Sequence, residues 1–189
     1  FVGLPDGGLL FTTKDGDLHA RTLTPKFGMP GDTLIEDEWA GEFAFVARED
    51  GRAHIAWTKR FNDGQGYTMS DLSMASIGVQ GDMSTPSSHL PPLKQSEGSY
   101  WGLDLSEKDG EVVLAGYHRD ILTGGSWNDV TNIFILQNED ATSSSSWITR
   151  MNVLNDIDIK PQNGDSLAVA IGDGQIHILY QSMRNDVSG

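Results

Sequence analysis

The feature that most constrains the fold of this chain is a repeated Asp-Gly pair set between two short apolar runs. Such a pair favours a two-residue hairpin turn of type I′, because both central residues of that turn have positive φ. The clearest copy is SLAVAIGDGQIHILYQ, residues 166–181. The pair occurs four times with apolar flanks, at Asp15–Gly16, Asp50–Gly51, Asp109–Gly110 and Asp173–Gly174. We therefore predict four β-hairpins with these pairs at their turns.

The spacing of the hairpins indicates the unit to which they belong. The second, third and fourth Asp residues follow the one before by 35, 59 and 64 positions. Residues 99–154 have the pattern of four consecutive antiparallel strands, which is the composition of a β-propeller blade. Blades usually repeat every 40 to 50 residues or so, so long loops must account for the wide intervals. The short first interval indicates a blade that lacks a strand or is completed by the other terminus. We predict an all-β fold of propeller blades, with a β-sandwich as the alternative.

The length of the chain bounds its organisation. With 189 residues it is long enough for one domain with a core, and we predict a single propeller-like domain over residues 1–189. Its repeats amount to about three blade units, whereas a closed propeller usually has about four to eight. We therefore expect either a homo-oligomer or the remaining blades of a longer polypeptide. The first residue is Phe1 and not Met, which we interpret as a processed chain or a fragment.

The composition of the chain limits the kinds of partner that it can bind. The formal net charge of −14 would repel nucleic acid and an anionic membrane surface, so we expect neither as a partner. The chain has no Cys, and no apolar run approaches the roughly 20 residues of a membrane helix. Motifs for nucleotides, for dinucleotides and for a complete calcium loop are also missing, so we predict no cofactor and no metal. We leave the localisation open and favour secretion.

Three of the four hairpins share a longer pattern, Asp-Gly-x-apolar-His, which ends at His19, His54 and His177. An imidazole at a recurring position can donate a hydrogen bond to a ligand hydroxyl, but it can equally tie neighbouring strands together. Two Trp residues have surroundings that suit a sugar. Trp127 follows a Gly-Gly-Ser stretch and Trp39 lies among carboxylates, so either ring can stack on the apolar face of a sugar or simply pack on a sheet.

The stretch 166–181 resembles the blade repeat of the fungal fucose-specific lectins. Ile176, Ile178, Tyr180 and Gln181 match the second strand of that repeat. The sugar-binding Arg of the family corresponds to His177, and to His54 in the second hairpin. The Glu and Trp of the family's next strand correspond to Glu36 and Trp39, beside His19. The resemblance implies a six-bladed propeller with sugar pockets between its blades.

We therefore predict a non-catalytic, lectin-like carbohydrate-binding protein whose partner is a glycan. The candidate ligand-binding residues are His19, Glu36, Trp39, His54, Trp127 and His177. Two alternatives stay open: a propeller glycoside hydrolase that uses a carboxylate pair, and a scaffold for protein interactions. Glu36 with Glu38, or Asp104 with Glu107, would be such a pair. In a regular strand Glu36 and Trp39 would face opposite sides, so a shared site requires a β-bulge or a strand end between them.

Overall fold

The computed structural model describes residues 1–23, 31–37, 41–66, 68–90, 92–94, 98–120, 130–138, 147–150 and 167–180. These residues form three antiparallel sheets and one further hairpin. Sheet I consists of β1 (Val2–Leu4), β2 (Gly7–Lys14), β3 (Asp17–Leu23) and β4 (Asp32–Glu36). Sheet II consists of β5 (Phe43–Ala47), β6 (Arg52–Asn62), β7 (Thr68–Gly78) and β8 (Ser87–Ser88), and β9 (Leu93–Lys94) also pairs with β7.

Sheet III consists of β10 (Gly98–Lys108), β11 (Glu111–Asp120), β12 (Val130–Asn138) and β13 (Trp147–Arg150). Hairpin IV consists of β14 (Leu167–Gly172) and β15 (Gln175–Tyr180). The all-β prediction is thus confirmed, as are the four consecutive strands within residues 99–154. Within the described residues, no helix is long and apolar enough to cross a membrane.

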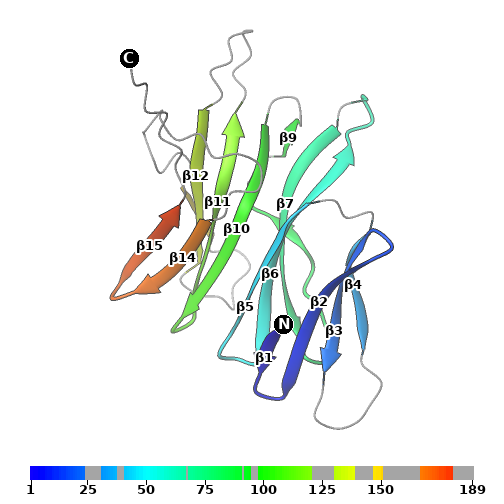
Figure 1. Ribbon diagram of the computed structural model, residues 1–189, viewed down its shortest axis with the longest axis vertical. Coiled ribbons are helices and arrows are strands. Elements are labelled where there is room, and N and C mark those ends of the chain that lie inside the picture. The colour runs from blue at the N-terminus through cyan, green and yellow to red at the C-terminus, as the bar shows by residue number, and fades with distance from the viewer. Residues whose placement is uncertain are drawn as a thin grey trace, which may run out of the picture.

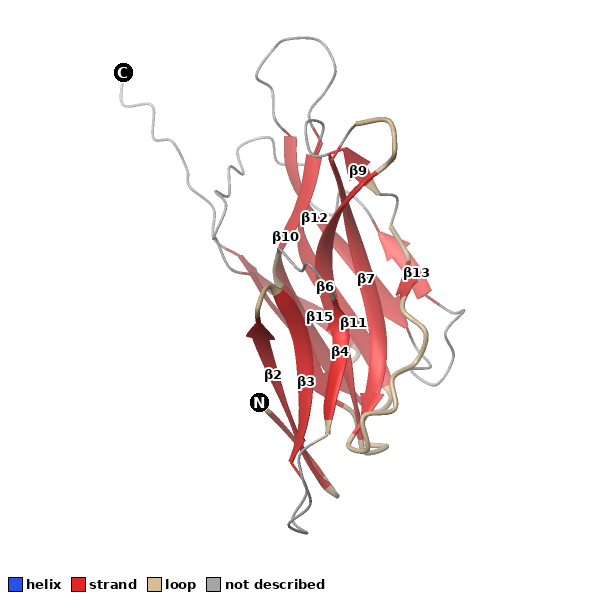
Figure 2. Ribbon diagram, turned by 90° about the vertical axis from the view of Figure 1, so that its right-hand side faces the viewer, coloured by secondary structure: helices blue, strands red, loops and turns tan. Residues whose placement is uncertain are grey.

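The sheets pack face to face in a row, from the blue sheet I to the orange and red hairpin IV in Figure 1. On β6, Ile55 and Trp57 point to sheet I, while Ala56 points to sheet III. This alternation buries the central strand on both faces, so apolar residues occupy successive positions. The first strand of each sheet contacts the first strand of the next, from β1 through β5 and β10 to β14. Sheets that meet along their first strands in this way are arranged as propeller blades. Figure 2 looks along the row from the side of sheet I, with β2, β3 and β4 in front.

All four Asp-Gly pairs lie in tight turns between paired antiparallel strands, as predicted. Asp15, Asp109 and Asp173 have φ of 55°, 54° and 51°, and each begins a two-residue turn. The pair at Asp50 differs, because only Gly51 has positive φ. There the Arg48 N–H donates to the Arg52 carbonyl at 2.8 Å across a loop of three residues. Three-residue hairpin loops of this kind place Gly in the left-handed region.

The first Asp-Gly turn has a different place in its sheet from the other three. It joins β2 to β3, whereas the later pairs join the first strand of a unit to the second. The matching turn of sheet I is therefore the one between Leu4 and Gly7. Pro5 of that turn has its Cδ 4.0 Å from the place that a Cβ on Gly51 would occupy. The short interval thus arises from comparing two different turns, and sheet I has all four strands instead of lacking one.

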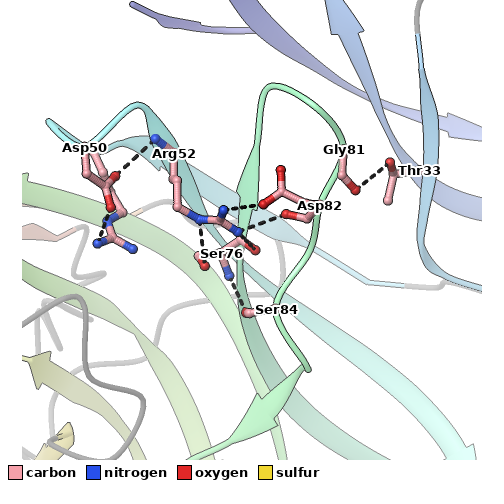
Figure 3. A network of polar contacts seen from close by, with 8 residues as sticks. Thr33, Asp50, Arg52, Ser76, Gly81, Asp82 and Ser84 are labelled. Atoms are coloured by element: carbon pink, nitrogen blue, oxygen red, sulfur yellow. Dashed lines mark hydrogen bonds and ion pairs between the residues drawn. The ribbon is translucent and has the colours of Figure 1, made fainter.

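Polar side chains tie neighbouring sheets together. Arg52 donates to the carbonyl oxygens of Ser76 at 3.3 Å and Asp82 at 2.9 Å, and to the Asp82 carboxylate, which fixes the loop after β7 (Figure 3). The hydroxyl of Thr33 on β4 donates to the Gly81 carbonyl in the same loop at 3.2 Å. This loop therefore joins sheet II to sheet I.

Candidate functional site

Glu36, the last residue of β4, lies at the junction of sheets I and II. The β3–β4 pairing places Leu18 opposite Glu36 and His19 opposite Leu34, so Ile35 is an extra residue in a β-bulge. The bulge turns the Glu36 side chain to the face of Leu18, toward sheet II. The predicted site required a bulge or a strand end between Glu36 and Trp39; the bulge lies before Glu36, and β4 ends at Glu36.

The Glu36 carboxylate is held by two side chains of β6. The indole Nε1 of Trp57 donates to Oε2 at 2.8 Å, and the Lys59 ammonium Nζ lies 3.8 Å from the same oxygen. The side chain of Glu36 is 17% exposed and that of Lys59 is 33% exposed. No hydrogen bond to the second oxygen, Oε1, comes from the part of the chain that the structure describes. A carboxylate fixed through one oxygen keeps acceptor capacity on the other.

A second carboxylate, that of Glu42, lies on the other side of β6. The main chain of Glu42 pairs with Thr58, the residue after Trp57, through an N–H···O bond of 2.9 Å. Its Oε2 accepts a hydrogen bond from the Gly102 N–H on β10 of sheet III. Trp39 lies between Glu36 and Glu42 in sequence and is outside the described residues. Nothing in the sequence distinguishes Glu42 from the other acidic residues, since only the pairing of sheets II and III reveals its contact.

His19 lies on the face of sheet I that points away from Glu36. Its Nδ1 donates to the Asp32 carboxylate at 3.0 Å, and Nε2 lies 4.0 Å from the Asp17 carboxylate. The structure therefore brings His19 to two aspartates and separates it from Glu36.

His54 and His177 occupy matching positions on β6 and β15, but they have different surroundings. His54 is buried between sheets II and III, with its ring centroid 6.3 Å from that of Trp147. Burial, followed by the nearby Arg48, lowers the pKa of His54 to about 4. Its Nε2 has no hydrogen-bond partner among the described residues. His177 is exposed on the outward face of hairpin IV. Neither residue lies near Glu36, and Trp127 falls outside the described residues.

The second predicted carboxylate pair is occupied by main-chain contacts. Asp104 accepts a hydrogen bond from the Val169 N–H at 2.8 Å, which joins β10 to β14. Glu107 accepts one from the Gly110 N–H at 3.1 Å within the hairpin turn. Both contacts are structural. Glu38, the partner of Glu36 in the other pair, is outside the described residues. The described residues contain no cluster of three or more metal-ligating side chains.

Comparison with known proteins supports the fold but assigns the chain to no family. No family model matches the chain, and no curated protein matches it. Among solved structures it is similar to an α-L-arabinanase of Penicillium chrysogenum complexed with arabinobiose, with a TM-score of 0.57 and 9% identity. That match covers 95% of this chain and 57% of the arabinanase. The fold is that of a β-propeller.

A thermostable family-43 glycoside hydrolase matches less well, with a TM-score of 0.47, 10% identity, and coverage of 96% of this chain and 77% of the other. This propeller chain thus spans little more than half the length of the arabinanase. At such identities the likeness concerns the fold alone.

Proposed function

We propose that this propeller binds carbohydrate without catalysis, at the junction of sheets I and II around Glu36. The observation that carries the proposal is the Glu36 carboxylate, which Trp57 and Lys59 fix through one oxygen, while no described residue donates to the other. The similar arabinanase, solved with arabinobiose, gives an example of this fold with a bound sugar.

The chemistry of the junction suits a sugar. A carboxylate oxygen accepts hydrogen bonds from one or two ligand hydroxyls, and the Lys59 ammonium donates to another. Trp39, in the connection that leaves Glu36, supplies an apolar ring of the kind that stacks on sugar faces. This assignment keeps Glu36 and Trp39 in the roles that the lectin resemblance implies. In contrast, His19, His54 and His177 are given no part in this site.

The proposal is tested by titration calorimetry with arabinobiose and with any glycan found on an array. Glu36→Gln should weaken binding by roughly tenfold or more, because a hydrogen bond to a charged group contributes about 1.5–3 kcal/mol. The amide oxygen of Gln still accepts from the Trp57 indole, so the fold is retained. Trp39→Ala should also weaken binding, whereas Glu49→Gln, at an exposed carboxylate, is the matched control. Unchanged affinity in both Glu36→Gln and Trp39→Ala would exclude this site.

A second candidate function is glycoside hydrolysis, which the fold shared with the similar arabinanase suggests, although the Glu36 and Glu42 side chains lie on opposite sides of β6. A glycosidase needs two carboxyl groups roughly 5–10 Å apart around the scissile bond. We favour binding, since the Glu42 carboxylate already accepts the Gly102 N–H. Release of reducing sugar from arabino-oligosaccharides, lost in both Glu36→Gln and Glu42→Gln, would decide for the enzyme.

A further inference from the structure

The row of sheets has two terminal faces, and each carries exposed apolar side chains. At each internal junction, two neighbouring sheets bury apolar side chains against each other. The earlier sheet contributes its following face, which points to the next sheet in the row. The later sheet contributes its preceding face, which points to the sheet before it. Two faces of the row lack such a neighbour within the described residues. One is the face of hairpin IV that points away from sheet III. The other is the face of sheet I that points away from sheet II.

The outward face of hairpin IV is uncharged and consists of small and apolar side chains, with His177 and Gln175 as its polar members. Leu167 and Val169 point to sheet III, so Ala168, Ala170, His177 and Leu179 point outward. Leu179 is 76% exposed. Residues 167–180 contain a single Asp, Glu, Lys or Arg, namely Asp173 in the turn, although the chain carries a net charge of −14. Another copy of this chain is also acidic and would be repelled by carboxylates. Because the outward face of hairpin IV carries none, a second copy can contact it without bringing like charges together.

Hairpin IV also matches a hairpin whose face is already covered. The outward pairs Ala168–Leu179 and Ala170–His177 correspond in register to Ala44–Ala56 and Val46–His54 of sheet II. Sheet III covers those residues, so that Ala56 is fully buried and His54 nearly so. Because the two hairpins match in register, we expect the outward face of hairpin IV to pack against the preceding face of another sheet, as sheet II packs on sheet III.

The outward face of sheet I is mixed, since it carries exposed apolar side chains together with His19 and its partner Asp32. Leu34 on β4 and Leu23 on β3 point away from sheet II and are 48% and 43% exposed. The Phe1 ring lies over Gly8 on the same side, because a Cβ on Gly8 would be 2.6 Å from it. Of the seven exposed large apolar side chains among the described residues, Phe1, Leu23, Leu34 and Leu179 therefore lie on the two terminal faces.

We propose that two copies of this chain associate head to tail. The outward face of hairpin IV in each copy packs on the outward face of sheet I in the other. The same junction then forms twice around a two-fold axis, which closes the row into a ring and leaves neither terminal face in water. One copy alone offers both halves of the junction, and no other kind of partner is needed to cover both faces.

The test is sedimentation velocity over a wide range of protein concentrations. The wild-type chain should have twice the monomer mass of 20.6 kDa. Leu179→Glu and Leu34→Glu should each weaken association by about a hundredfold or more, because an unpaired carboxylate would be buried in the junction. Both residues are exposed within one copy, so circular dichroism should show an unchanged fold. Ile148→Glu, at an exposed residue of β13 away from both faces, is the matched control and should leave the dimer intact.

Cross-linking identifies which faces meet. The chain has no Cys, so Leu34→Cys and Leu179→Cys each introduce a single thiol. Sheets pack about 10 Å apart, and a bis-maleimide of that length should link the two variants when they are mixed. A monomer at all concentrations, larger open assemblies, or efficient linkage of Leu179→Cys to itself would overturn the proposal. None of these results depends on sugar binding, so the outcome is independent of the proposed function.

Discussion

The hairpins β5–β6 and β14–β15 are built alike but end in different environments. Their registers match, with Val46 opposite His54 in one and Ala170 opposite His177 in the other. Both place an imidazole on the face that points to the following sheet. Sheet III covers that face of β5–β6, whereas nothing within the described residues covers it on β14–β15, where His177 and Leu179 are exposed.

The comparison shows that the contribution of a hairpin side chain to stability depends on whether a neighbouring sheet covers it, and not on the hairpin sequence alone. An apolar side chain contributes about 25 cal/mol for each Å² removed from water, so the same position gains much in one unit and little in the other. Matched substitutions in the two hairpins measure this difference directly.

The largest effect should come from Trp57→Ala compared with Tyr180→Ala. The two residues occupy equivalent positions, opposite Phe43 and Leu167, but Trp57 is fully buried against sheet I and Tyr180 is 36% exposed. Trp57→Ala should lower the free energy of unfolding by about 3–5 kcal/mol, whereas Tyr180→Ala should lower it by about 1 kcal/mol or less. Urea unfolding measures both.

If Trp57→Ala fails to fold, Trp57→Phe keeps an aromatic ring while it removes the indole donor to Glu36 and part of the buried ring volume. Its cost should be about 1–3 kcal/mol, because the carboxylate loses a hydrogen bond in a partly buried site. Equal losses in Trp57→Ala and Tyr180→Ala would contradict the comparison.

The pH dependence of stability should report the burial of His54. The pKa of His54 falls from 6.5 to about 4 through burial and then through Arg48, with a smaller effect of Arg52 and an opposing one of Asp50. Above pH 6.5 the His54 ring is neutral in both the folded and the unfolded chain, so the His54 contribution to the free energy of unfolding does not change with pH. Between pH 6.5 and 4 the unfolded chain binds a proton that the folded chain excludes, so stability falls by up to about 3 kcal/mol.

This pH effect is isolated by comparing wild type with His54→Leu, in which the corresponding loss between pH 6.5 and 4 should disappear. His89 packs against the same Trp147 ring at 5.3 Å, and burial lowers its pKa too, so a smaller acid-dependent loss should persist in the variant. A profile that is the same in wild type and His54→Leu would show that burial of His54 has no energetic consequence.

The sequence predicted the local elements well because turn chemistry is local. An Asp-Gly pair defines a hairpin through the φ of two residues, and all four predicted turns are present. The blade boundaries were harder to predict. The pair at Asp15 joins the second and third strands of its sheet, so His19 lies on a different strand and a different face from its counterpart His54.

The candidate site was less predictable for a related reason. A bulge at Ile35 determines on which face of sheet I the Glu36 side chain lies, and the residue types of that strand do not predict the bulge. The contacts of Glu42 and Asp104 join residues 60 or more positions apart, to Gly102 and Val169. Such contacts depend on how the sheets stack, which strand patterns alone leave undetermined.

The smallest of these effects should come from exchanging Arg52 and Gln175, the residues that open the second strand of each hairpin. Arg52 fixes the loop after β7 through the Ser76 and Asp82 carbonyls and the Asp82 carboxylate (Figure 3). Asp82 is largely exposed, so the ion pair itself contributes little, and the hydrogen bonds to carbonyls account for most of the effect. Arg52→Gln should therefore cost about 1 kcal/mol of unfolding free energy and loosen the Gly81 contact with Thr33, seen as faster amide exchange in that loop. Gln175→Arg should change neither, since Gln175 is exposed and hairpin IV has no such loop among the described residues. A loss in Arg52→Gln that vanished in high salt would show instead that the ion pair, and not the carbonyl contacts, holds the loop.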